Sequence, residues 1–257
     1  MAKQNDETTD RTLGCRYELK YRIAESQAAL VAQFIKPYMH LDRYCKLQPG
    51  STYPIVALYL DSGDFRLCRE TLEGKKNRFK LRIRSYTDEP DHPCFFEIKR
   101  RFNNIIIKSR TRVRRQEIAT LLSGRHLPPQ YYYPNNEEVL NQFQLYMSYI
   151  NARPVIRIRY MRQAYEGGLF NRVRVTFDRE LSYNTTSKPD VTLNDTGWQH
   201  VPLNFVILEI KFTGRYPAWL NQMVRCLNLK RTSMSKYASA IKQSCSLGFC
   251  APPLVVW

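Results

Sequence analysis

The sequence lacks the short motifs that identify many common enzymes. It has no GxxxxGK[ST] phosphate loop, no GxSxG elbow and no Cys/His nucleophile pair, so neither a P-loop nucleotide site nor a covalent enzyme intermediate is predicted. Its seven cysteines form no CxxC pair and no zinc spacing, and their number is odd. We therefore expect reduced, mostly buried thiols in a cytoplasmic protein. The four histidines are scattered and receive no role.

Long apolar runs and acidic residues are also scarce. No stretch approaches the ~20 apolar residues that cross a membrane, and the polar N-terminus has no signal-peptide core. A soluble protein without a membrane span is therefore expected. Only 23 Asp and Glu oppose 40 Lys and Arg, which leaves a formal net charge of +17. Such an excess predicts an anionic partner, either nucleic acid, an anionic membrane or a phosphorylated small molecule.

Short segments that alternate charged and apolar residues are the main feature present. In one of them Arg78, Lys80, Arg82 and Arg84 alternate with Phe79, Leu81 and Ile83, which is the period of a β-strand. About eight strands are predicted, over residues 16–22, 54–61, 78–86, 94–101, 105–114, 155–165, 172–178 and 205–212. Helical patterns cover residues 24–38, 64–74, 136–150, 218–229 and 235–245, and a loop covers 184–204.

The repeated basic faces indicate how these strands assemble. Like charges on neighbouring strands destabilise a sheet by up to ~1 kcal/mol per pair, so several basic strands need a polyanion or interspersed acids. Acids occur in three E-x-K pairs, Glu18/Lys20, Glu97/Lys99 and Glu209/Lys211, each of which could instead be a structural salt bridge. We predict an α+β fold, a closed antiparallel β-barrel of about eight strands with helices packed outside, because closure also removes the edge strands. This domain would span residues 15–246, between a disordered leader (1–14) and a C-terminal tail (247–257).

Two of the three partner classes fit the pattern poorly. Aromatic residues such as Phe79, Phe96 and Phe177 lie on the face opposite the charges, where they resemble core rather than a base-stacking surface. The basic residues lie in strands rather than on an amphipathic helix, which disfavours a membrane surface. No nucleic acid is therefore expected as a partner, and a phosphorylated small molecule remains.

Eight segments carry a family resemblance. RYELKY, YLDSGDF, KLRIRSY, FFEIKRR, RPVIRIRYMRQAY, RVRVTFD, VILEIKF and SMSKYASAI follow one another between residues 16 and 243, and in this order the sequence resembles VTC domains, the polyphosphate polymerase domains of the triphosphate tunnel metalloenzyme superfamily. The resemblance implies a tunnel that binds ATP, tripolyphosphate, pyrophosphate or polyphosphate. It implies transfer of the γ-phosphate of ATP to a growing polyphosphate chain, with Mn²⁺ or Mg²⁺ as cofactor. Hydrolysis of tripolyphosphate or a nucleoside triphosphate, and polyphosphate binding without catalysis, remain alternatives.

The resemblance also implies site residues. The catalytic cations would be Arg82, Arg84, Lys99, Arg162, Arg174 and Lys236, and the substrate would also contact Lys20, Tyr160 and Ser235. Lys80 and Lys211 join the substrate-binding set because they share strand faces with these residues. Glu209 would hold the metal, with Glu18 and Glu97 as further candidate ligands. Asp178 shares a strand face with Arg174, and we expect it to orient that arginine rather than to bind metal.

Two positions depart from the family pattern. Ser233 stands where polymerases can carry a second basic residue before the final Ser-Lys, and Arg16 replaces the first acid of the superfamily's E-x-E-x-K strand. A third question is one of strand parity. Arg157 and Arg159 cannot share the lumen with Tyr160 and Arg162 unless the strand has a bulge, and the resemblance favours the latter pair.

Overall fold

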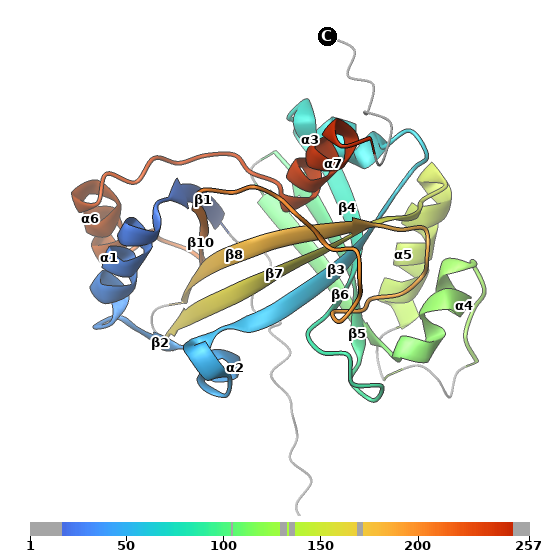
Figure 1. Cartoon of the computed structure of the whole chain (residues 1–257), viewed down its shortest axis with the longest axis horizontal. Coiled ribbons are helices and arrows are strands. Elements are labelled where there is room, and N and C mark those ends of the chain that lie inside the picture. Colours follow the sequence, from blue (N-terminus) through green and yellow to red (C-terminus); the bar gives the residue numbers. More distant parts are fainter. Residues whose placement is uncertain (1–16, 104, 129–132, 134–136, 169–171, 249–257) are drawn as a thin grey trace, which may run out of the picture.

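The computed structural model describes residues 17–103, 105–128, 133, 137–168 and 172–248. The expected leader and most of the expected tail lie outside these residues. The described chain forms one antiparallel sheet of ten strands with helices around it (Figure 1), so the α+β class is confirmed. None of the described helices is both long and apolar enough to cross a bilayer.

Eight strands form the main path of the sheet, in the order β1-β10-β8-β7-β3-β4-β5-β6. They are β1 (Tyr17–Ile23), β3 (Tyr53–Asp61), β4 (Asn77–Ser85), β5 (Cys94–Phe102), β6 (Ile105–Val113), β7 (Arg153–Gly167), β8 (Val173–Thr185) and β10 (Val206–Phe212). Two short strands flank this path: β2 (Met39–Leu41) pairs with β7, and β9 (Gln199–His200) pairs with β8. The alternation therefore found each long strand, and it missed the two short ones because two or three residues carry no period.

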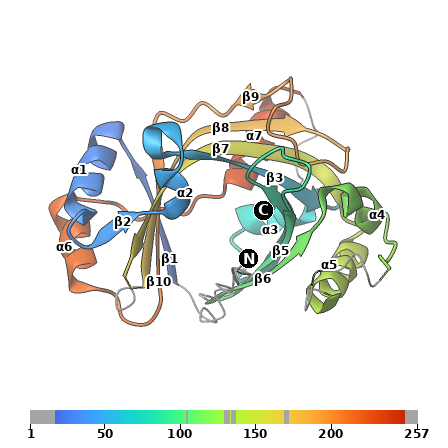
Figure 2. The same ribbon diagram turned by 90° about the horizontal axis from the view of Figure 1, so that it is seen from below.

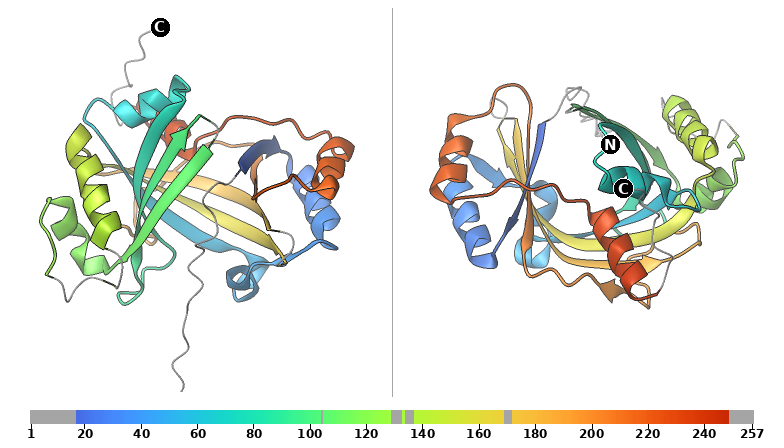
Figure 3. Two further views of the ribbon diagram at one scale, coloured as in Figure 1. Left: turned by 180° about the vertical axis from the view of Figure 1, so that it is seen from behind. Right: turned by 90° about the horizontal axis from the view of Figure 1, so that it is seen from above.

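The predicted closed barrel is wrong, because β1 and β6 remain the two edges of an open sheet. Figure 2 shows the sheet as an arch, with β1 and β10 on one side and β5 and β6 on the other, and Figure 3 shows the gap from behind. The edge of β1 pairs instead with the segment that precedes α7. Tyr21 forms an antiparallel bridge with Arg231, and the amide of Thr232 donates to the carbonyl of Lys20 at 2.8 Å. Side chains span the gap instead, since Lys99 Nζ lies 2.9 Å from Glu18 Oε2.

The helices cover the apolar side of the arch and its two ends. Helices α1 (Glu25–Ile35) and α6 (Ala218–Cys226) pack on β1, β8 and β10, and α4 (Ile118–Leu122) and α5 (Glu137–Ile150) pack on β4, β5 and β6. The short α2 (Arg43–Lys46) lies at one end of the strands, and α3 (Arg66–Leu72) and α7 (Lys236–Ser246) lie at the other (Figure 1). Single 3-10 turns cover Pro49–Ser51 and Arg115–Glu117. The polar side of the arch, here the inner face, is the side on which the predicted site residues lie.

Candidate functional site

The inner face carries two neighbouring groups of ion pairs, one around Glu97 and one around Glu18, Glu209 and Asp178, which together with Lys80 we name the charged cluster. Its members come from β1, β4, β5, β6, β7, β8, β10 and the start of α7. Ten cations, Lys20, Lys80, Arg82, Arg84, Lys99, Lys108, Arg110, Arg162, Lys211 and Lys236, surround four carboxylates, Glu18, Glu97, Asp178 and Glu209. The cluster thus has six more cations than carboxylates.

Glu97 is the centre of one half of the charged cluster. Its side chain is fully buried and lies 2.7 Å from both Arg82 and Lys108, with Arg110 at 3.5 Å and Arg84 at 3.9 Å. Strand register explains this arrangement. Glu97 lies on β5, directly opposite Arg82 on the neighbouring strand β4 and directly opposite Arg110 on the other neighbouring strand, β6. Burial alone would raise the pKa of Glu97, but the surrounding arginines, Arg84 first, hold it well below its usual range.

Glu209 is the centre of the other half. Its oxygens lie 2.8 Å from Lys211, 3.1 Å from Lys236, 3.4 Å from Lys20 and 3.6 Å from Arg162. Burial opposes its ionisation, yet Lys211 and Lys236 outweigh burial and hold the pKa of Glu209 well below its usual range. The carboxylate is therefore ionised at neutral pH.

Arg162 and Lys236 meet on Asp178. Arg162 donates two hydrogen bonds to Asp178, at 2.6 and 2.7 Å, and Lys236 Nζ lies 2.5 Å away. The expectation that Asp178 orients Arg174 is therefore wrong: it orients Arg162. Tyr160 lies against the same two cations, with its ring centroid 5.3 Å from Arg162 Cζ and 4.8 Å from Lys236 Nζ. The pairing of β7 with β8 shifts register between Arg159 and Met161. Beyond this shift, Arg162 stands directly opposite Asp178.

Lys80 has a different environment from the other lysines. It donates to Ser235 Oγ at 2.7 Å, and its nearest charged neighbours include Lys20 and Lys99. Burial, reinforced by these two cations, lowers the pKa of Lys80 well below its ordinary value. Ser235 is also the N-cap of α7, as predicted, and accepts from the amide of Ala238. A phosphate oxygen beside Lys80 would favour its protonated form.

Four positions considered in the sequence lie apart from the charged cluster. Arg174 pairs with Asp42 at 2.7 Å and with Glu166, near the α2 end of the strands. Arg157 and Arg159 lie on the opposite side of the sheet, where Arg157 pairs with Asp190 and Asp195 and Arg159 bonds to the carbonyl of Leu193. Ser233 is exposed just before α7.

The structure adds residues that the sequence reasoning did not select. Lys108 and Arg110 belong to the charged cluster because both pair with Glu97. The alternation of residues 105–114 is the same signal that selected Arg82 and Arg84, and it could have selected these two as well. Tyr59 accepts from Arg82 at 3.3 Å. Asp61, at the end of β3, accepts from Tyr237 Oη at 2.5 Å and thereby holds the start of α7. No sequence signal links Asp61 to Tyr237, because 176 residues separate them.

A family model, described as the VTC domain, matches residues 15–245. The chain belongs to the VTC domain family. The match covers most of the chain and confirms the resemblance that the eight segments carried. No curated protein matches the sequence.

Solved structures resemble parts of this VTC domain at low sequence identity, and one of them reaches a TM-score of 0.50. A candidate adenylate cyclase from Bacillus halodurans superposes with a TM-score of 0.50 at 12% identity, covering 87% of this chain and 96% of that one. The PH1819 protein of Pyrococcus horikoshii gives 0.44 at 11% identity, with coverages of 89% and 99%. The Mimivirus capping enzyme triphosphatase gives 0.34 at 8% identity, with coverages of 84% and 89%.

The carboxylates of this VTC domain offer a divalent metal few protein ligands. The described residues contain no group of three or more His, Cys, Asp or Glu side chains placed to hold an ion. Glu18 and Glu209 nevertheless share Lys20 as a partner, at 3.3 and 3.4 Å, so the two carboxylates face a common position. Mg²⁺ and Mn²⁺ at phosphate sites typically use one or two protein carboxylates and complete their shell with phosphate and water oxygens. This pair fits that requirement, although cations contact both carboxylates, whereas Glu97 shares none of its four cations with a second carboxylate.

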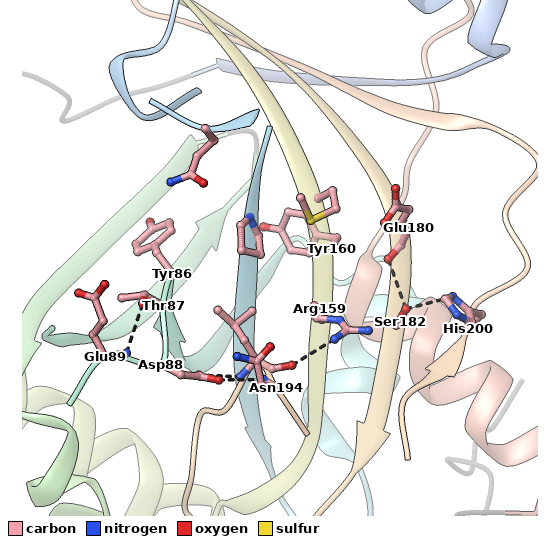
Figure 4. Close-up of a pocket in the computed structure, with 14 residues that line it drawn as sticks. Tyr86, Thr87, Asp88, Glu89, Arg159, Tyr160, Glu180, Ser182, Asn194 and His200 are labelled. Carbon is pink, nitrogen blue, oxygen red and sulfur yellow. Dashed lines mark hydrogen bonds between the residues drawn. The ribbon is translucent and has the colours of Figure 1, made fainter. Parts of the chain in front are cut away.

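The VTC domain also has an open hollow of about 560 Å³ on the outer side of the sheet. Figure 4 shows it over β3, β7 and β8, with Arg159, Ser182 and His200 on one side and Tyr86 and Thr87 on the other. Ser182 and His200 are within hydrogen-bonding distance, at 3.2 Å. Tyr86 and Tyr160 line the hollow and also contact cations of the charged cluster, so the two regions meet at these rings.

Proposed function

We propose that this VTC domain is a metal-dependent polyphosphate polymerase that binds the triphosphate of ATP on the inner face and transfers its γ-phosphate to a polyphosphate chain. The observation that carries the proposal is that the partly buried charged cluster contains six more cations than carboxylates. Charges of one sign that are desolvated together need a multivalent counterion. A triphosphate or longer polyphosphate supplies several negative charges along one line.

The proposed reaction needs positioned cations rather than a protein nucleophile. A terminal oxygen of the polyphosphate attacks the γ-phosphorus of ATP, the bond from that phosphorus to the β–γ bridging oxygen breaks, and ADP leaves with the electron pair. In a loose transition state the charge spreads over the phosphoryl and bridging oxygens, so electrostatic stabilisation provides most of the catalysis. Arg82, Arg84 and Arg162 suit this role because guanidinium groups bind phosphate oxygens in pairs.

The substrate would replace internal partners of the cations. Arg82 and Arg162 each use an Nε–H on a carboxylate, at 2.7 and 2.6 Å, which holds their planes in fixed orientations. Lys80 and Lys99 lie on the same face with lowered pKa values, burial being the largest cause for both. Phosphate binding there would favour their protonated forms.

A metal, when bound, would screen the phosphate charges and polarise a phosphoryl oxygen. Glu209 and Glu18 would hold it, because an oxygen of each lies within reach of Lys20 Nζ, at 3.4 and 3.3 Å, so the two carboxylates face a common position. We propose Mn²⁺ or Mg²⁺ on the basis of this oxygen donor set.

Product analysis tests the proposal. Purified protein is incubated with ATP and Mn²⁺, and the products are separated on a gel that resolves polyphosphate chains. Long chains together with ADP are expected. Free phosphate without chains would identify a hydrolase, and unchanged ATP together with tight polyphosphate binding would identify a binding module.

A further inference from the structure

We propose that the end of the inner face near α2 binds the aromatic base of a nucleoside triphosphate whose phosphates lie on the charged cluster. This inference rests on the proposed function and specifies which end of the site receives the nucleoside. The carrying observation is a group of rings, here the aromatic patch, made of Tyr44, Tyr53, Tyr86, His92 and Phe95.

The rings of the aromatic patch contact one another in a chain. Tyr44 and Tyr53 have centroids 6.2 Å apart, Tyr53 and Tyr86 6.1 Å, and Tyr86 and Phe95 5.8 Å. These contacts are tilted or edge-on rather than stacked. Arginines lie over three of these rings, Arg43 over Tyr44 and Arg110 over Phe95 and Tyr86, so a planar ligand would stack on the outer face of an arginine or on the uncovered face of a ring.

Arg110 links the aromatic patch to the charged cluster. Its Cζ lies 3.6 Å from the centroid of Phe95 and 5.9 Å from that of Tyr86, while its Nε lies 3.5 Å from Glu97. A guanidinium stacked on a ring presents its second planar face outward, and nucleic-acid bases stack on such arginines as well as on aromatic rings. The exposed fraction of the Arg110 side chain is 35%, so this second face can be reached.

The spacing along the strands suits a nucleotide. Phe95 precedes Glu97 by two residues on β5, and Tyr86 follows Arg84 by two residues beyond β4, so each ring shares a sheet face with a cluster residue about 7 Å away. Phosphates beside Arg82 and Arg84 would therefore point their nucleoside toward these rings. Tyr44, on α2, is 53% exposed, so solvent reaches this end of the inner face.

The opposite end of the inner face offers no comparable surface among the described residues. There Arg78 faces Arg101 across β4 and β5, and Lys80 faces Lys99. The nearest rings, Tyr59 and Tyr237, stack on each other with centroids 4.8 Å apart and are buried. A nucleoside has ring partners at one end, and an extended polyanion has cations at the other.

Binding measurements that isolate the base test this inference. ATP is compared with ribose 5-triphosphate, which lacks only the base, by calorimetry in the presence of a chelator that prevents turnover. The variants are Tyr44→Ala, on the exposed α2, and Phe95→Leu, which keeps an apolar side chain but removes the ring. Phe102→Ala is the matched control, because Phe102 is 46% exposed at the far end of the same strand.

We expect wild-type protein to bind ATP about tenfold more tightly than ribose 5-triphosphate, the order expected for stacking of one base. Tyr44→Ala and Phe95→Leu should reduce this ratio toward one without changing the affinity for ribose 5-triphosphate, and Phe102→Ala should keep it. Equal wild-type affinities, or a ratio that survives both variants, would overturn the base site while leaving the proposed function intact. Failure of both triphosphates to bind would instead contradict the proposed function.

Discussion

At the scale of single residues, Glu97 shows how the positive charges of the site are partly neutralised. Four cations converge on this one fully buried carboxylate, and each of them shares it with the other three. A buried carboxylate is costly unless paired, and here the pairing is shared. Glu97 therefore fixes the positions of cations that remain under-neutralised, and these cations can gain further charge pairing from a phosphate.

Arg82→Ala is expected to weaken tripolyphosphate binding about ten- to a hundredfold, since a hydrogen bond to a charged group contributes ~1.5–3 kcal/mol. Alternation alone would suggest that losing a cation relieves repulsion and stabilises the empty protein. The 2.7 Å contact with Glu97 argues for the opposite, a lower melting temperature, because a buried carboxylate loses a partner. Calorimetry and thermal unfolding measure the two effects, and the double variant with Glu97→Gln should recover part of the stability. Undiminished affinity for tripolyphosphate would exclude Arg82 from the site.

Glu209→Gln separates the role of the carboxylate toward metal from its role toward the lysines. Without metal, the variant should bind tripolyphosphate at least as tightly as wild type, because one negative charge leaves the site. Stimulation of turnover by Mn²⁺ should be lost, because the proposed ligand is neutral. Glu97→Gln is the comparison, as Glu97 is enclosed by other cations. Full Mn²⁺ stimulation in Glu209→Gln would remove Glu209 from the metal site.

At the scale of elements, α7 brings the last two sequence-selected residues to the inner face. Ser235 and Lys236 reach the charged cluster because Tyr237, the next residue, is fixed between Tyr59 and Asp61. Asp61 also accepts from the amides of Ser62, Leu67 and Cys68, so it joins β3, α3 and α7. The position of Lys236 thus depends on a contact behind the site.

Tyr237→Phe should destabilise the protein by ~1.5–3 kcal/mol, since it removes one hydrogen bond from a buried carboxylate while keeping the ring stack. It should also weaken tripolyphosphate binding, because the start of α7 loses its anchor. Tyr149→Phe on α5, which removes an exposed hydroxyl that accepts from Arg66 of α3, is the control and should change neither property. An effect on stability with no effect on binding would limit Asp61 and Tyr237 to the core.

The sequence predicted elements and faces better than edges and partners. Alternation over nine residues located β4 and oriented Arg82 and Arg84 correctly, because the two-residue period carries both facts. It carried no information about whether β1 would pair with β6, which depends on the path of residues 231–232. It also placed Arg174 among the cluster cations, because Asp42, its partner, lies 132 residues away. The pattern did not identify an aromatic surface at Tyr53, Tyr86 and Phe95, because the aromatic residues that stood out, such as Phe79 and Phe96, lie on the apolar face.

At the scale of the whole molecule, the net charge of +17 has a concentrated component on the inner face. An anion that binds only the folded state stabilises it by RT ln(1 + [L]/Kd), ~2.7 kcal/mol at a hundredfold excess over Kd. Tripolyphosphate should therefore raise the melting temperature by several degrees, and more than chloride of equal total charge. A short DNA duplex should raise it little at physiological salt, where loose phosphate contacts are weak. One thermal-shift plate gives the comparison, and equal stabilisation by DNA would indicate that the relevant charge faces outward.

The open edge between β1 and β6 has a consequence for how a long polymer reaches the site. The gap is spanned by the Lys99–Glu18 ion pair and not by backbone hydrogen bonds, so separating the two side chains breaks no sheet ladder. A closed barrel would admit a polyphosphate only if one end of the polymer entered the opening first. An arch that is fastened by side chains can receive the middle of a chain from the side and release it the same way. The domain could then engage a pre-existing polymer at internal positions, and its grip on the chain would depend on ionic strength.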